Sequence, residues 1–306
     1  MIVTAMLCMV LIPLLGALVC AVLPKNLPRV VGLVAAVVVA ALVLLILPNA
    51  FREPINRGLG NLPWLSGKVD TPIFGVFLDP LGYVLLLVVG VIGFLTVLFS
   101  TSYVSMKNRE HATKAEEQGR YYFWLLLFIA SMIGVALSPN FLQLFVFWEM
   151  TTVCSWALIS FYQTEKGLRA GFKAMVMTHF GGLFFLFALL LLFVEAHSFE
   201  FSALAKLSNG TRAIVFVFLM IAAWAKAAQI PFHVWLPDAM EAPTPVSAYL
   251  HAAAMVKAGV YLMARSASAG WMMPDWLSFL MGAMALLTIL VALSFYFVQD
   301  DLKSLL

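Results

Sequence analysis

Four ionisable side chains stand inside apolar stretches of this 306-residue chain, and their types suit the transfer of protons. Glu149 lies in LFVFWEMTTVCSW, Lys226 in IAAWAKAAQIPF, and His251 and Lys257 in YLHAAAMVKAGVYL. A charge at the centre of a lipid bilayer costs at least about 2.5–3.5 kcal/mol, so such a residue needs a partner, a water-filled cavity or a function. A carboxylate, two lysines and a histidine on neighbouring segments therefore indicate a chain of titratable groups that transfers protons.

Each of these residues also has a purely structural interpretation. Glu149 can be a neutral or paired carboxyl that serves packing, and His251 can be a core histidine bonded to a carbonyl. His179, in MVMTHFGG, is open to both interpretations and is at most an accessory group. Lys257 follows His251 by six residues, which places the two on different faces of a helix, so they suit successive transfer steps better than one shared ligand.

A proline close to Lys226 predicts a break in its helix. Pro231 lacks a backbone N–H and clashes with the preceding turn, so the helix should end or unwind just after Lys226. Free carbonyls at membrane depth are tolerated only where they face protein or water, as in the broken helices of transporters. The following segment HVWLPDAMEAPTP contains Asp238 and Glu241, possible accessory groups that should lie at the inner boundary of the membrane.

The composition places these residues in an all-α, multi-pass membrane protein. The chain is 63% hydrophobic and 11% charged, against about 45–50% and 25% for a soluble domain. A transmembrane helix needs about 20 apolar residues, and we expect about nine such helices, one of them broken. The stretch 49–76, rich in proline and glycine, predicts an external loop or a short hairpin. The predicted spans are 2–23, 29–48, 77–101, 121–137, 140–162, 168–195, 213–229, 243–265 and 276–298.

The distribution of basic residues predicts that the N-terminus lies outside a cytoplasmic (inner) membrane. Cytoplasmic loops carry an excess of Lys and Arg, and this orientation places ten basic residues inside and six outside. The inner ten are Lys25, Arg29, Lys107, Arg109, Lys114, Arg120, Lys166, Arg169, Lys173 and Lys303. The outer six are Arg52, Arg57, Lys68, Lys206, Arg212 and Arg265.

Several other classes of function are disfavoured. The formal charge of +3 provides no basic surface for nucleic acid. Cys8, Cys20 and Cys154 lie inside apolar runs without the spacing of a metal site or a disulfide framework. We therefore expect no catalytic residue, cofactor, metal or redox centre in this chain, and a lipid bilayer around it.

The run from FWE through AKAAQIPFHVWLPDAMEAPTPVSAYLHAAAMVKAGVYL to DDLKSLL resembles the antiporter-like membrane subunits. These subunits are shared by respiratory complex I, multisubunit sodium/proton antiporters and membrane-bound hydrogenases. Within that family, the KNREH loop, the RYY that opens the next span and the CSWALIS run look most like the D component of hydrogenase-4 in formate-hydrogenlyase-type complexes.

The resemblance implies two inverted five-helix repeats, each with a half-channel and a central broken helix. It assigns Glu149 to the buried glutamate, Lys226 to the lysine beside the break, His251 to the linking histidine and Lys257 to a lysine of the antiporter and hydrogenase branches. We expect N-terminal helices over 1–120, the first half-channel unit over 121–266 and the start of an incomplete second unit over 267–306. The chain is then a split or truncated subunit or part of a longer one.

Three hypotheses follow. The leading one is a proton-translocating subunit of a hydrogenase complex, whose partners are other membrane subunits and peripheral hydrogenase and iron–sulfur subunits. The chain would supply ion movement and not the redox chemistry. The second is a subunit of a multisubunit sodium/proton antiporter. The third is a membrane anchor that holds a redox enzyme and moves no ions.

Overall fold

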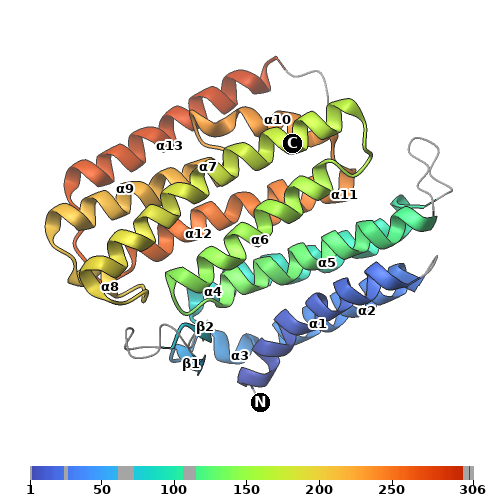
Figure 1. The fold of residues 1–306 in the computed structure, drawn as a ribbon, viewed down its shortest axis with the longest axis horizontal. Helices are drawn as coiled ribbons and strands as arrows, with labels where there is room; N and C mark the ends of the chain where they lie inside the picture. The colour runs from blue at the N-terminus through green and yellow to red at the C-terminus, as the bar shows by residue number, and fades with distance from the viewer. Residues whose placement is uncertain (1, 24–26, 61–71, 106–114, 299–302, 304–306) are drawn as a thin grey trace.

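The computed structural model describes residues 2–23, 27–60, 72–105, 115–298 and 303. Their architecture is a bundle of long helices with one two-stranded sheet at one end (Figure 1). The first half of the chain contains α1 (Ile2–Val22), α2 (Leu27–Leu45), α3 (Leu47–Ala50), β1 (Ile55–Gly60), β2 (Phe74–Leu78), α4 (Pro80–Tyr103), α5 (Ala115–Leu137) and α6 (Phe141–Ile159). The second half begins with α7 (Glu165–Ala196), α8 (Ala203–Lys206) and α9 (Asn209–Lys226).

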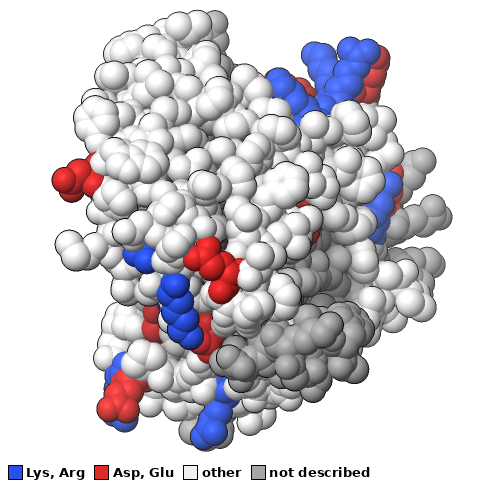
Figure 2. Space-filling model, turned by 60° about the vertical axis from the view of Figure 1, so that its left-hand side comes forward, with Lys and Arg blue, Asp and Glu red and all other residues white. Residues whose placement is uncertain are grey.

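The nine predicted spans are confirmed. Nine helical segments among the described residues are long and apolar enough to cross a membrane, which makes this a multi-pass membrane protein. Their ends lie within a few residues of the predicted ones: the fifth, for example, runs over Phe141–Ile159 against the prediction of 140–162. Figure 2 shows a face that is largely free of charged side chains, as expected of a protein embedded in lipid.

Side-chain caps explain where several helices begin. The side chain of Asp79 accepts a hydrogen bond from the Gly82 amide before α4, and that of Asn140 accepts one from the Gln143 amide before α6. Thr164 caps α7 in the same way through the Gly167 amide. Each cap satisfies an amide that has no partner within its own helix.

The stretch 49–76 contributes to a hairpin, as predicted, although residues 61–71 lie outside the described part of the chain. Strands β1 and β2 pair antiparallel. The Gln143 side chain fixes the hairpin to α6, because its oxygen accepts from the Gly75 amide and its nitrogen donates to the Gly75 carbonyl, both at 2.9 Å. Figure 1 shows the hairpin at the same end of the bundle as α8.

The segment after Lys226 is irregular before it returns to a long helix. Figure 1 shows α10 and α11 at the opposite end of the bundle from the hairpin. The eighth span, Thr244–Ala267, combines α11, the π-helix η3 and α12. The elements are η1 (Phe232–Val234), α10 (Trp235–Asp238), η2 (Ala239–Glu241), α11 (Thr244–Ser247), η3 (Ala248–Ala253), α12 (Met255–Ala267) and α13 (Asp275–Tyr296).

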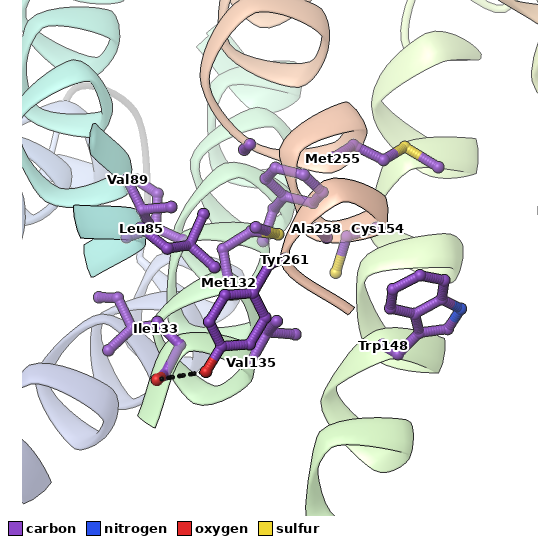
Figure 3. Close-up of a cluster of buried hydrophobic side chains, with 14 of the residues drawn as sticks. Leu85, Val89, Met132, Ile133, Val135, Trp148, Cys154, Met255, Ala258 and Tyr261 are labelled. Atoms are coloured by element: carbon purple, nitrogen blue, oxygen red, sulfur yellow. Dashed lines mark hydrogen bonds between the residues drawn. The ribbon is translucent and has the colours of Figure 1, made fainter. Parts of the chain in front are cut away.

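The hydrophobic core lies where α4, α5, α6 and α12 meet (Figure 3). Helix α5 is the most buried of the nine spans: 78% of its apolar segment is buried inside the bundle. The corresponding share of α13 is only 6%. Tyr261 of α12 donates a hydrogen bond to the Ala136 carbonyl of α5 at 3.2 Å. Lys226, described next, therefore lies in a closely packed, largely apolar interior.

Candidate functional site

Lys226 is the last residue of α9, and its side chain is fully buried. Two glycines let the neighbouring helices approach this end of α9. A Cβ added to Gly181 of α7 would lie 2.5 Å from the Ala225 Cβ, and one added to Gly259 of α12 would lie 2.6 Å from the Ala223 carbonyl oxygen. Both approaches are too close for any side chain, so the glycines permit the packing that surrounds Lys226.

The Lys226 ammonium reaches the middle of α6, where it meets neutral acceptors. Its Nζ donates to the Trp148 carbonyl oxygen at 2.7 Å and to Thr152 Oγ1 at 2.9 Å. The same nitrogen lies 4.6 Å from the centroid of the Trp148 ring, within range of a cation–π interaction. Figure 3 shows Trp148 on α6 beside the buried cluster to which α12 contributes Met255, Ala258 and Tyr261. A buried cation is thus held by dipoles and an aromatic ring.

Glu149 is paired with a histidine of the next helix. Its Oε2 lies 2.7 Å from His179 Nδ1 of α7, and its Oε1 is buried without a hydrogen-bond partner among the described residues. The Glu149 side chain is 21% exposed and that of His179 is 60% exposed. Within the described part of the chain, Glu149 and Lys226 do not form an ion pair within 4.0 Å.

Gly182 makes room for the Glu149 carboxylate. A Cβ at that position would collide with Glu149 Oε1. In the sequence His179 is followed closely by Gly181 and Gly182, but the sequence does not show which neighbours these glycines contact. The structure shows that Gly181 accommodates α9 and that Gly182 accommodates the carboxylate.

His251 lies in the π-helix η3, and its ring is turned toward Trp235, with the ring centroids 6.1 Å apart. Both of its ring nitrogens are buried and have no hydrogen-bond partner within the described ranges. Trp235 in turn donates from Nε1 to the Ala225 carbonyl at 3.0 Å. No hydrogen bond between described residues joins His251 directly to Lys226 or Lys257.

Among the described residues, the remaining predicted groups form no hydrogen bond or ion pair with Lys226. Lys257 is exposed on α12, whereas His251 is turned inward, so the two lie on different faces as their spacing predicts. Asp238 forms an ion pair with Lys173 of α7, with 2.7 Å between Oδ2 and Nζ, and Glu241 is exposed. The described residues contain no group of three His, Cys, Asp or Glu that could hold a metal ion.

The helix containing Lys226 ends where the sequence predicts. Helix α9 stops at Lys226, and Pro231 follows in a turn before η1. Ala228, between the two, has a φ of 51°, a left-handed conformation that an α-helix does not contain. The carbonyl of Ala225, freed by the end of the helix, accepts the Trp235 bond described above.

Sequence reasoning missed a second buried charge. Arg265, assigned to an outer loop by its position, lies in α12 and donates to both carboxylate oxygens of Asp79, at 2.5 and 2.8 Å. Its side chain is 5% exposed and its guanidinium stacks near the rings of Phe77 and Phe201. A single arginine close to the predicted end of a span cannot be told from a loop residue by hydropathy alone.

Asp79 lies just before α4, outside the spanning segment. Burial raises the pKa of Asp79, but the hydrogen bonds from Arg265 and Gly82 and the guanidinium charge outweigh that effect. The net result is a pKa below the ordinary value of an aspartate. The pair ties α12 to the hairpin end of the bundle.

Comparisons with known proteins identify the family and the fold of the chain. The family model described as "NADH:quinone oxidoreductase/Mrp antiporter, TM" matches residues 138–306. The Na(+)/H(+) antiporter subunit A1 of Staphylococcus aureus is 36% identical over 313 residues, which cover 97% of this chain and 37% of that protein. The chain therefore spans little more than a third of the length of that relative.

Two solved structures share the fold. A chain of the Mrp complex from Dietzia sp. DQ12-45-1b superposes with a TM-score of 0.83 at 32% identity, over 99% of this chain and 32% of that one. A chain of the membrane-bound sulfane sulfur reductase, an archaeal respiratory membrane complex, gives 0.82 at 25% identity, over 98% and 61%. The chain belongs to the family of antiporter-like membrane subunits shared by NADH:quinone oxidoreductases and Mrp antiporters.

Proposed function

We propose that this chain supplies a proton-conducting unit to a multisubunit sodium/proton antiporter. The observation that supports this most strongly is the fully buried Lys226 at the end of a broken helix, held by the Trp148 carbonyl and Thr152 rather than by a carboxylate. An unpaired buried ammonium is costly, so the free energies of its charged and neutral forms are brought close together. A lysine in this state suits reversible protonation.

Glu149 is the group that sets the charge state of Lys226 in this proposal. It follows Trp148 on α6, so the carboxylate lies near the ammonium without touching it. In a low-dielectric interior two opposite charges interact across several ångströms, and an anionic Glu149 favours the ammonium. Transfer of a proton from His179 to Glu149 weakens that attraction and favours release of the lysine proton.

Residues 121–266 form the proposed half-channel unit. His251 and Lys257 act after Lys226 on the path, and Pro231 keeps α9 from continuing past Lys226. Asp238, paired with Lys173, and Glu241 lie near the inner entrance in the proposed orientation, which has the N-terminus outside the plasma membrane.

The antiporter proposal is favoured over the hydrogenase hypothesis because the Staphylococcus aureus relative is named an Na(+)/H(+) antiporter subunit and the Dietzia chain comes from an Mrp complex. The KNREH loop, one of the three segments on which the narrower similarity to the D component of hydrogenase-4 depends, lies outside the described residues. A redox-driven complex is the second candidate, supported by the similarity to the sulfane sulfur reductase chain. Other membrane subunits are the proposed partners in both cases, and only the second requires peripheral redox subunits.

Sodium-dependent proton movement in everted membrane vesicles tests the proposal. The vesicles come from cells that lack their own sodium/proton antiporters and express this chain with its neighbouring subunits. After respiration acidifies the lumen, added NaCl should dissipate the pH gradient reported by acridine orange. Vesicles lacking this chain should not respond. A preparation that ignores sodium and acidifies only when a reductant is supplied would support the redox candidate instead.

A further inference from the structure

Among the described side chains, Thr152 is the one that lies within hydrogen-bonding distance of both Lys226 Nζ and the Trp148 carbonyl oxygen. Its Oγ1 accepts from Lys226 Nζ at 2.9 Å and lies 3.3 Å from the Trp148 oxygen, to which it can donate. The Trp148 oxygen also accepts from Lys226 at 2.7 Å and from Thr151 Oγ1 at 2.7 Å. One carbonyl thus receives three side-chain donors, while Thr152 Oγ1 is both acceptor and donor.

The two acceptors of Lys226, the Trp148 carbonyl and the Thr152 hydroxyl, differ in whether they can donate a hydrogen bond to a neutral lysine. An ammonium only donates hydrogen bonds, and a carbonyl only accepts them, but a hydroxyl does both. A neutral amine has a lone pair that needs a donor. Thr152 can rotate its O–H from the Trp148 oxygen to Lys226 Nζ, because Thr151 continues to satisfy that oxygen.

Because the site is buried, water cannot replace the hydrogen bond that this rotation provides. Lys226 and Thr151 are 0% exposed and Thr152 is 1% exposed, so solvent does not reach them from the bundle surface. A buried donor or acceptor left without a partner costs free energy comparable to a lost hydrogen bond. A site that must hold both forms of the lysine therefore needs a group that adapts to each.

We propose that Thr152 is a positioning residue that stabilises Lys226 in both protonation states by reversing the direction of their shared hydrogen bond. With the ammonium, Thr152 Oγ1 accepts from Nζ and donates to the Trp148 carbonyl. With the neutral amine, Thr152 O–H donates to the Nζ lone pair. This inference rests on the proposed function, since it assumes that Lys226 gains and loses a proton.

Substitutions at Thr152 test the inference in the assembled complex. Thr152→Val keeps the shape of the side chain and removes the hydroxyl, so the rate of proton transport should fall at least about tenfold, the effect of one unmade buried hydrogen bond. Thr152→Ser keeps the hydroxyl and removes a methyl group, so most of the rate should return. The control is Thr178→Val on α7, a fully buried threonine whose hydroxyl bonds to the Ala174 carbonyl away from Lys226.

The outcomes separate this inference from the proposed function. Wild-type vesicles and Lys226→Ala vesicles are measured beside the variants. If the wild type transports protons and Lys226→Ala does not, but Thr152→Val matches the wild type, the inference is wrong and the proposed function stands. A Thr152→Ser variant as slow as Thr152→Val would also overturn it. If Thr152→Val does not assemble, Thr152→Ser is compared with Thr152→Ala, and equal rates in those two contradict a role for the hydroxyl.

Discussion

At the scale of residues, the site separates its charges into two groups. Glu149 pairs with His179 on the accessible side, at 2.7 Å, while Lys226 is held inside by the Trp148 carbonyl and Thr152. This arrangement differs from a direct Glu–Lys ion pair, which would fix both charges and oppose proton release. In the proposed mechanism, the proton occupancy of Glu149 alters that of Lys226 without a direct contact between the two groups.

Substitutions of Glu149 test this separation. Glu149→Gln keeps the shape but has no charge to influence Lys226, so proton transport should fall at least about tenfold. Glu149→Asp keeps the titration with a shorter reach and should retain more of the rate. The measurement is sodium-induced collapse of the pH gradient in everted vesicles, with equal amounts of assembled complex. Equal rates for the two variants would show that the carboxylate serves packing.

Sequence alone could identify Lys226 and Glu149, because a charge within an apolar run is costly wherever it points. It could not identify Thr152, because a threonine in a membrane helix ordinarily bonds its own backbone, as Thr178 does. The pairing of Glu149 with His179 was also out of reach, since it depends on how α6 and α7 face each other. The roles of His251 and Lys257 stay predictions.

At the scale of elements, glycines set how closely the helices around Lys226 approach one another. Gly181 and Gly259 allow α7 and α12 to pack closely against α9, and Gly182 leaves space for the Glu149 carboxylate. The nine spans and the end of α9 before Pro231 follow from hydropathy and proline chemistry, so sequence could predict them. The π-helix η3 could not be predicted, because an extra residue in a helical turn leaves no local pattern.

A substitution of Gly182 tests whether this glycine makes room for the Glu149 carboxylate. Gly182→Ala places a methyl group against Glu149 Oε1, so it should displace the carboxylate, cost about 1–3 kcal/mol of stability and slow proton transport. Gly210→Ala near the start of α9 is the control, since nothing lies within 4 Å of its added Cβ. The melting temperature of the purified complex and the transport rate are measured for both. A Gly182→Ala complex indistinguishable from the Gly210→Ala complex would refute the close contact.

At the scale of the whole molecule, the Asp79–Arg265 pair joins the two halves of the chain at the hairpin end. Asp79→Asn leaves a buried guanidinium without its counter-ion, which should cost about 3 kcal/mol and lower the melting temperature of the complex. Glu165→Gln is the control, because Glu165 and its partner Arg169 are 79% and 81% exposed and such pairs contribute little. A loss of stability no greater than in the control would contradict this role for the pair.

The same pair predicts how stability depends on pH. The pKa of Asp79 is lower in the folded protein than in the unfolded chain, so its stabilisation is present at neutral pH and is lost as the pH falls through the folded-state pKa. The difference in melting temperature between the wild type and Asp79→Asn should therefore shrink as the pH falls below about 4. A difference that stays constant as the pH is lowered well below that value would show that the carboxylate is not the source of the stability.

The whole chain corresponds to part of its longer relatives, and this relation limits what sequence could predict. The resemblance in the AKAAQIPFHVW to GVYL run correctly indicated the antiporter-like family and its helical fold. The narrower similarity to the D component of hydrogenase-4 is not confirmed, because the compared proteins are an Na(+)/H(+) antiporter subunit, an Mrp complex and a sulfane sulfur reductase. The ion that drives the complex stays a proposal.

Proton flux through reconstituted complexes that differ only at Lys226 tests the central claim most directly. The purified complex, with wild-type chain or with Lys226→Ala, is placed in liposomes that contain a pH-sensitive dye, and a sodium gradient is applied. We expect Lys226→Ala to assemble normally and to transport protons at least about 100-fold more slowly, whereas Lys206→Ala, at an exposed residue of α8, should match the wild type. Wild-type flux in an assembled Lys226→Ala complex would contradict the account.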